Sequence, residues 1–170
     1  VNLGFGTDAL LKLHEEEAAE ASWVFKNKGA GRATAAASAG LVFLWDVDEG
    51  VNRLDAFLEA EEEEIRAGGL LGVGLAHAGV RQPDVDMADL YLQEHVAEGP
   101  ARERLCAVLG YGAAYGGTAR DDLLQLLSPL LLEEAAGMEL VGAAALTRQH
   151  RAEVVRQRLR LRERDALAPP

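Results

Sequence analysis

The sequence predicts an all-α protein, an α-α solenoid of helical hairpins that repeat along the chain. Three observations predict this fold class. Two segments rich in small apolar residues align without a gap at an offset of 38 residues. Between them lie segments whose apolar residues recur three and four positions apart, which is the pattern of an amphipathic helix. No alternating run of β-branched residues is long enough for a strand.

The first kind of segment, called A, predicts helices that pack closely. Residues 65–79 (IRAGGLLGVGLAHAG) align with residues 103–117 (ERLCAVLGYGAAYGG). A weaker copy spans 35–45 at an offset of 34, and a fourth begins at 137–146. Glycine costs a helix up to about 1 kcal/mol relative to alanine, which close approach of another backbone can offset. We therefore expect the repeated glycines to be contact points between neighbouring A helices: Gly72, Gly74, Gly79, Gly110, Gly112 and Gly117.

The second kind of segment, called B, predicts amphipathic helices over residues 51–58, 86–96 and 122–132. Pro129 is expected to kink or end the third of them, because it lacks a backbone donor. Asp84 and Asp121 are expected N-caps, and Gly79 and Gly117 are expected C-terminal stops. The predicted apolar stripes are Val51, Leu54, Phe57 and Leu58 in the first B helix, and Met87, Leu90, Tyr91 and His95 in the second.

The chain is therefore expected to have three parts: a lead-in with a short helix (1–32), helical-hairpin repeats (33–147) and an arginine-rich tail (148–170). Charge marks the last boundary. Residues 1–147 carry a net charge of −15, whereas residues 148–170 hold seven arginines and carry +4. Glycines also vanish after Leu146. We expect that the tail is not repeat sequence, whether it is a genuine tail, an altered splice, a frameshift or an error in the gene assignment.

The glycine segments do not have the pattern of a nucleotide site. A dinucleotide fingerprint needs a third glycine where His77 and Tyr115 stand, and it must follow a strand. The histidines His14, His77, His95 and His150 are too scattered to predict a metal centre. Cys106 is interpreted as a buried structural thiol, and the acidic run 59–66 as a solvated helix start. We expect no catalytic residue, no cofactor and no metal.

Composition restricts the classes of partner. A net charge of −11 disfavours nucleic acid, because an acidic surface repels phosphates. No apolar run approaches the length of a membrane span, and no signal peptide is visible. The single cysteine cannot form a disulfide within the chain, which fits a reducing compartment. We therefore expect a soluble intracellular protein that binds neither nucleic acid nor membrane.

Several stretches, in order and at compatible spacing, resemble the proteasome/cyclosome repeat family. They are LGFGTDALLKL (3–13), SWVFKNKGAG (22–31), AAASAGLVFLWDVDEG (35–50), AGVRQ (78–82), and GLAHAG with its partner GAAYGG. The resemblance covers residues 2–147. It implies a closed α-helical toroid with inner and outer helices, of which this chain would be an open fragment, and a non-catalytic scaffold in the base of the proteasome regulatory particle, in cytoplasm and nucleus.

The resemblance also implies partners. These are the ATPase ring and other regulatory-particle subunits, ubiquitin or the ubiquitin-like domains of shuttle receptors, and a deubiquitinating enzyme. By this resemblance, the receptor site of the family uses acidic and apolar side chains of outer helices, which meet the basic-rimmed apolar patch of ubiquitin. The matching segment here is the third B segment. The next outer helix has no matching segment, so we expect a weakened or absent site. The candidate partner-binding residues are Asp121, Asp122, Gln125, Glu133 and Glu134.

Two other classes of function remain compatible with the sequence. One is a helical-repeat adaptor with partners unrelated to protein degradation, and the other is a small helical hydrolase. The hydrolase lacks any apparent nucleophile and base pair in the sequence. Capping and simple solvation are the structural alternatives for the candidate partner-binding residues.

Overall fold

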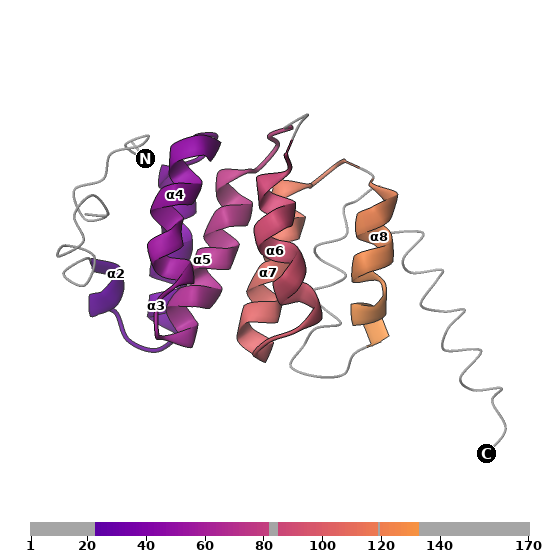
Figure 1. Ribbon diagram of the computed structural model, residues 1–170. Coiled ribbons are helices and arrows are strands. Elements are labelled where there is room, and N and C mark those ends of the chain that lie inside the picture. The colour runs from indigo at the N-terminus through magenta and orange to yellow at the C-terminus, as the bar shows by residue number, and fades with distance from the viewer. Residues whose placement is uncertain (1–22, 82–84, 119, 133–170) are drawn as a thin grey trace, which may run out of the picture.

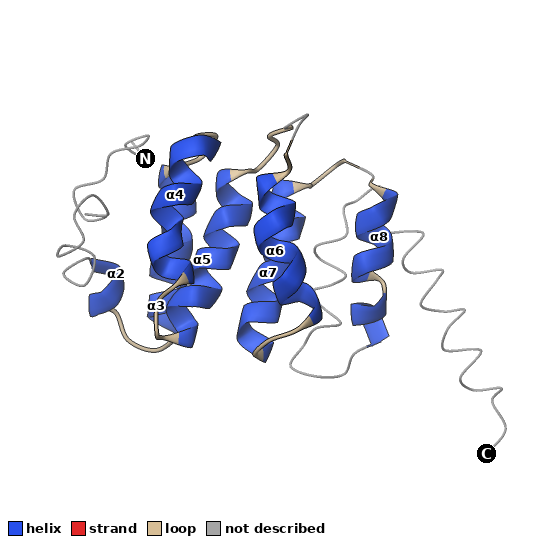
Figure 2. Ribbon diagram, in the orientation of Figure 1, coloured by secondary structure: helices blue, strands red, loops and turns tan. Residues whose placement is uncertain are grey.

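The computed structural model describes residues 23–81, 85–118 and 120–132, and every regular element in these ranges is helical (Figures 1 and 2). The prediction of an all-α protein is confirmed. The elements are α2 (Trp23–Lys26), α3 (Ala30–Val42), α4 (Val47–Leu58), α5 (Glu63–Ala76), α6 (Met87–Ala97), α7 (Ala101–Ala114), α8 (Asp121–Leu127) and a short 3₁₀ helix, η1 (Pro129–Leu132).

The A segments form a row of helices. α5 packs between α3 and α7, while α4 and α6 lie against α5 and α7 respectively (Figure 1). We call α3, α5 and α7 the A helices, and α4, α6 and α8 the B helices. Because α5 has neighbours on most sides, nine of its fourteen residues are buried. Small residues at this density allow helix axes to approach closely.

Glycines lie where consecutive A helices touch, and among those expected to do so Gly72, Gly74 and Gly110 are found there. For Gly79 and Gly117 the expectation is wrong, because they follow the ends of α5 and α7 and an added β-carbon would meet no atom within 4 Å. A β-carbon added at Gly40 of α3 would lie 2.1 Å from the carbonyl oxygen of Gly72 in α5. One added at Gly74 of α5 would lie 2.3 Å from the α-carbon of Gly110 in α7. In each contact, the second glycine position of one A segment meets the first glycine position of the next. The row is therefore held by the same backbone contact twice.

The B helices only partly follow the predicted stripes. In α4, Val51, Leu54 and Phe57 are buried as expected. In α6 the predicted stripe is wrong, because Leu90 is 65% exposed. The buried line instead runs at four-residue spacing through Ala88, Leu92 and Val96. This helix carries apolar residues on several faces, so periodicity alone did not select the face that packs on α7.

The A helices end in a recurring backbone arrangement. Trp45, Gly79 and Gly117 occupy equivalent repeat positions and have φ angles of 71°, 78° and 80°. The backbone N–H of Trp45 donates to the carbonyl of Ala76 (2.9 Å), and that of Gly79 donates to the carbonyl of Ala114 (3.3 Å). Gly79 and Gly117 thus stop their helices, as predicted. Trp45 differs from the two glycines in having a side chain, whose indole N–H also donates to the next hairpin, at the carbonyl of Ala78 (3.1 Å).

The positive φ of Trp45 leads to a prediction about two substitutions. A left-handed conformation costs a non-glycine residue roughly 1–2 kcal/mol, and glycine avoids that cost. Both Trp45→Gly and Trp45→Ala lose the indole hydrogen bond, but only the first relieves the strain. We expect the free energy of unfolding, measured in urea, to be about 1 kcal/mol higher for Trp45→Gly than for Trp45→Ala. Equal stabilities for the two variants would contradict the claim that the positive φ strains the backbone at Trp45.

Helix boundaries correct two expected caps. Asp84 lies outside the described residues, and Asp86 caps α6 by accepting from the N–H of Asp89 (3.3 Å). Asp121 is the first residue of α8 rather than its cap, which is Arg120. The expectation for Pro129 is confirmed, because α8 ends at Leu127 and the chain continues as η1. The short lead-in helix is α2, whereas the tail 148–170 and the fourth A segment lie outside the described residues.

Candidate partner-binding surface

The start of α8 presents three of the five candidate partner-binding residues to solvent. Asp121, Asp122 and Gln125 are exposed. The same short helix buries Leu123 and Leu127, which fixes the direction in which the polar side chains point. Glu133 and Glu134 lie outside the described residues. Within α8 the structure therefore brings together an acidic pair and an amide on one solvent face.

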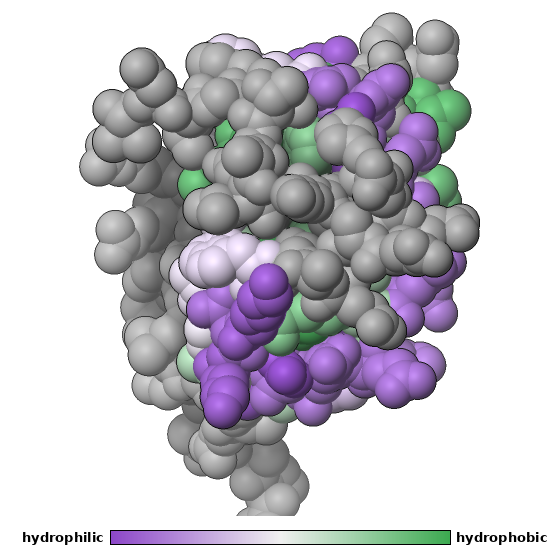
Figure 3. Space-filling view, turned by 90° about the vertical axis from the view of Figure 1, so that its left-hand side faces the viewer, coloured by the Kyte–Doolittle hydropathy of each residue, from purple (hydrophilic) through white to green (hydrophobic). Residues whose placement is uncertain are grey.

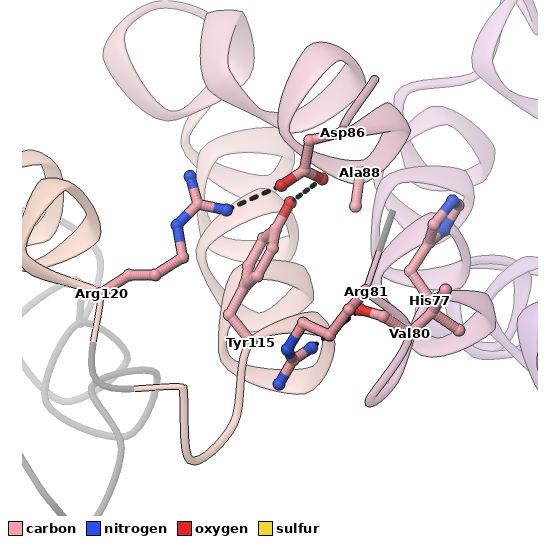
Figure 4. A pocket seen from close by; sticks show the side chains of 7 residues that line it. All are labelled: His77, Val80, Arg81, Asp86, Ala88, Tyr115 and Arg120. Atoms are coloured by element: carbon pink, nitrogen blue, oxygen red, sulfur yellow. Dashed lines mark hydrogen bonds and ion pairs between the residues drawn. The ribbon is translucent and has the colours of Figure 1, made fainter. Parts of the chain in front are cut away.

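Arg120 links this surface to the rest of the repeat. Its guanidinium donates to Asp122 through Nε (3.1 Å to Oδ1) and to Asp86 through Nη1 (2.7 Å to Oδ2). The guanidinium carbon also stands 4.7 Å from the ring centre of Tyr115. The Tyr115 hydroxyl donates to Asp86 in turn (Figure 4). The starts of α6 and α8 and the end of α7 are thus joined by one polar network.

The network changes the titration of its acids. Burial raises the pKa of Asp86, but hydrogen bonds from Tyr115 and Arg120 outweigh burial, so the pKa lies below its ordinary value of 3.8. For Asp122 the hydrogen bond from Arg120 is the main cause of a lowered pKa. Burial and the bond to Asp86 raise the pKa of Tyr115, which stays protonated. Asp122 is therefore ionised and bound to Arg120, whereas the side chain of Asp121 faces solvent.

Removing the charge of Arg120 should make stability less dependent on pH. Both aspartates have lowered pKa values, so their contribution is full above about pH 4 and is lost as pH falls through their folded pKa values. We expect Arg120→Gln to lower the free energy of unfolding at pH 7, and the deficit to shrink as pH falls below about 4. Urea unfolding between pH 2.5 and 7 measures this.

The control for this prediction is Arg53→Gln, which removes the same charge from the Arg53–Glu49 pair on α4, where the carboxylate is exposed and the guanidinium lies 5.5 Å from the ring centre of Phe43. Such a pair contributes only about 0.5 kcal/mol. A deficit in Arg120→Gln that is independent of pH, or one equal to that of the control, would contradict the assignment of the network.

A hollow of about 140 Å³ lies beside the network (Figure 4). Arg120, Asp86 and Tyr115 line one part of it, and His77 and Arg81 line another. His77 is 3% exposed and its Nδ1 donates to the carbonyl of Val73 (2.8 Å), which agrees with the expected packing role at the position equivalent to Tyr115. The lining belongs to loops and helix ends that hold one hairpin on the next.

Other residues singled out in the sequence have structural roles. Cys106 is buried, and burial raises the pKa of its thiol, so it is held as the neutral thiol. The acidic run places Glu63 and Glu64 in the first turn of α5, as expected for a helix start. Across the described ranges no group of three or more potential ligands could hold a metal ion. No helix in those ranges is both long and apolar enough to cross a membrane.

Sequence reasoning missed two features of the surface. Leu90 was assigned to a buried stripe, yet it is the most exposed large apolar residue of the B helices in the described part. Nothing in the sequence indicated that Arg120 binds Asp86, because the two residues lie 34 positions apart and only the folded repeat brings them together. The opposite end of the row, seen in Figure 3, is mostly hydrophilic where it is coloured, with apolar residues showing at several separate places.

No protein-family model matches the chain. The chain is 38% identical over 146 residues to the 26S proteasome non-ATPase regulatory subunit 2 of Dictyostelium discoideum. It is 41% identical over 147 residues to the 26S proteasome regulatory subunit rpn1 of Schizosaccharomyces pombe. Each alignment covers 86% of this chain and 16% of the relative, so the chain spans about a sixth of their length. Over those residues, the chain belongs to the family of the 26S proteasome non-ATPase regulatory subunit 2.

Proposed function

We propose that this region is a non-catalytic part of the proteasome regulatory particle, where it serves as a scaffold in the base and contacts the ATPase ring and other subunits. The identity to two regulatory subunits across most of the chain carries the proposal. The row of A helices supports it, because repeated backbone contacts give a stiff element that holds surfaces at fixed spacing. Such a role implies residence in cytoplasm and nucleus.

We further propose that the B-helix side receives ubiquitin or a ubiquitin-like domain, in the service of ubiquitin-dependent protein degradation. The exposed acids of α8 offer the charge that a basic-rimmed partner needs, and Leu90 offers an apolar contact on the neighbouring B helix. Asp121 is the acid most available to a partner, since Arg120 engages Asp122. Glu133 and Glu134 would extend the same acidic surface.

The test is an NMR titration of the isotope-labelled chain with ubiquitin and with a shuttle ubiquitin-like domain. Shifts should cluster at residues 121–134 and near Leu90. We expect Asp121→Asn to weaken binding about two- to fivefold at low salt, because an exposed charge pair contributes about 0.5–1 kcal/mol. The difference should shrink in high salt, which screens such pairs.

A matched control separates a specific site from general attraction to an acidic protein. Glu61→Gln removes one exposed negative charge from the turn before α5. Equal weakening by Glu61→Gln and Asp121→Asn would contradict a site at α8. Absence of binding by the wild-type chain would leave the scaffold role without the receptor role, as would be expected of an adaptor with other partners.

A further inference from the structure

The hollow beside the polar network contains a cation that has no ionic partner among the described residues. Two arginines and one aspartate line the hollow, so positive charge exceeds negative charge there. Arg120 is engaged, because its guanidinium donates to Asp86 (2.7 Å) and to Asp122 (3.1 Å). Arg81 is exposed, and within the described part its guanidinium donates only to the carbonyl of Val80 beside it (2.8 Å). Most of the donors of Arg81 are therefore available to a ligand.

His77 gives a second, independent observation at the same place. It lines the hollow, and its side chain is almost fully buried. Its Nδ1 donates to the carbonyl of Val73, whereas its buried Nε2 has no hydrogen-bond partner among the described residues. Buried polar atoms without a partner are rare in native proteins, and water, an ion or a ligand often completes their bonding. Figure 4 shows His77 and Arg120 on opposite sides of the hollow, with Tyr115 and Asp86 between them.

The size and charge of the hollow restrict the class of ligand. Its volume of about 140 Å³ holds a few water molecules, which suits one small polar group on a short stem. Val80, Ala88 and the ring of Tyr115 supply apolar walls for such a stem. A carboxylate matches the guanidinium of Arg81 in bidentate geometry. A phosphate monoester carries nearly two negative charges at pH 7, and the carboxylate of Asp86 in the lining would repel the second one.

We propose that the hollow between the end of α5, the start of α6 and the end of α7 binds a single carboxylate group. Arg81 is the direct ligand, while Arg120 and Asp86 form the fixed wall opposite. A bound anion also stabilises the protonated form of the His77 ring, in which Nε2 becomes a donor. The carboxylate belongs either to a free small acid or to an acidic side chain of a partner. This site goes beyond the proposed receptor surface, which is acidic and would take a basic-rimmed partner.

An NMR titration of the isotope-labelled chain at pH 7 and constant ionic strength tests the proposal. The probes are acetate and a Gly-Glu-Gly peptide with both termini blocked. Each should give saturable shifts with a Kd of the order of millimolar, as expected for one charged contact. The ring signals of His77 should move together with the backbone amides that surround the hollow, which are those of Val80, Arg81, Ala88 and Tyr115. Equal affinities would identify a free acid as sufficient, and tighter binding of the peptide would identify an acidic side chain; either result supports the carboxylate site.

Variants show whether Arg81 is the ligand. Arg81→Gln should raise the Kd at least about tenfold, because a hydrogen-bonded charge is lost, and Arg81→Lys should recover part of the affinity. Lys28→Gln is the matched control, since it removes one exposed positive charge just before α3, outside the hollow. Circular dichroism checks that each variant is folded. Arg81→Gln should leave the titration with ubiquitin unchanged, so this proposal and the receptor role can fail separately.

Four results would overturn the carboxylate site. The first is the absence of saturable shifts with both probes. The second is equal binding of a blocked Gly-Gln-Gly peptide, which has the same shape without the charge. The third is equal weakening by Lys28→Gln and Arg81→Gln, which would indicate general attraction to positive charge. The fourth is tighter binding of inorganic phosphate than of acetate, which would assign the hollow to another class of anion.

Discussion

Gly74→Ala should destabilise the protein by about 3 kcal/mol, at the upper end of what overpacking usually costs. The added carbon would lie 2.3 Å from both the α-carbon and the carbonyl oxygen of Gly110. Backbone atoms cannot rotate away as a side chain can, so α5 and α7 would have to separate along their length. Separation would lose packing in the centre of the row, where α5 is buried on most faces.

Gly72→Ala is the matched control, because it adds the same methyl two residues earlier in the same helix. Its new carbon would meet Leu54 Cδ2 at 3.4 Å and the carbonyl oxygen of Ala36 at 3.5 Å, which are ordinary contacts. Alanine favours a helix over glycine by up to about 1 kcal/mol. We therefore expect Gly72→Ala to be neutral or slightly stabilising in urea unfolding. Similar losses for the two variants would show that helix propensity or general crowding, rather than the Gly74–Gly110 contact, controls stability.

This pair of glycines shows where sequence reasoning stops. The offset of 38 residues made Gly72 and Gly74 members of one repeated pattern and predicted that helices touch there. Nothing in the pattern distinguished Gly74, where a β-carbon would strike the next backbone, from Gly72, where a β-carbon has room. That difference depends on the rotation of α5 about its axis, which is fixed by α3 and α7 together. The repeated sequence pattern predicted the row of helices, whereas the role of each glycine depends on how those helices pack.

The remaining differences have similar causes. The stripe of α6 was assigned to Leu90 because apolar spacing allowed it, whereas contact with α7 selected Ala88, Leu92 and Val96. Trp45 could not be predicted to take a left-handed conformation, since glycine holds the equivalent positions. At the candidate surface, the exposure of Asp121 followed from its position before an apolar stripe. The pairing of Asp122 with Arg120 arises from the fold of the hairpin ends.

Arg66→Met should cost about 2–3 kcal/mol, because it leaves the carboxylate of Glu103 buried without its main partner. Glu103 is 4% exposed, and the Arg66 guanidinium donates to it through Nε at 2.9 Å. Arg66 also donates to the carbonyls of Ala60 and Glu61 at the end of the preceding hairpin (2.8 and 2.7 Å). One side chain thus joins α5 to α7 and to the turn before it. The partial exposure of Arg66 keeps the expected loss below that of a fully buried pair.

A double-mutant cycle separates the ion pair from the other bonds of Arg66. Glu103→Leu alone should also be destabilising, because it leaves Arg66 with unused donors in a half-buried place. The double variant Arg66→Met, Glu103→Leu should recover about 1–2 kcal/mol relative to the sum of the single losses, since neither charge is then left unpaired. Urea unfolding at pH 7 in low and high salt measures the cycle. A coupling energy near zero would mean that Arg66 acts only through the carbonyls of the preceding turn, and that its ion pair with Glu103 does not help to hold α5 on α7.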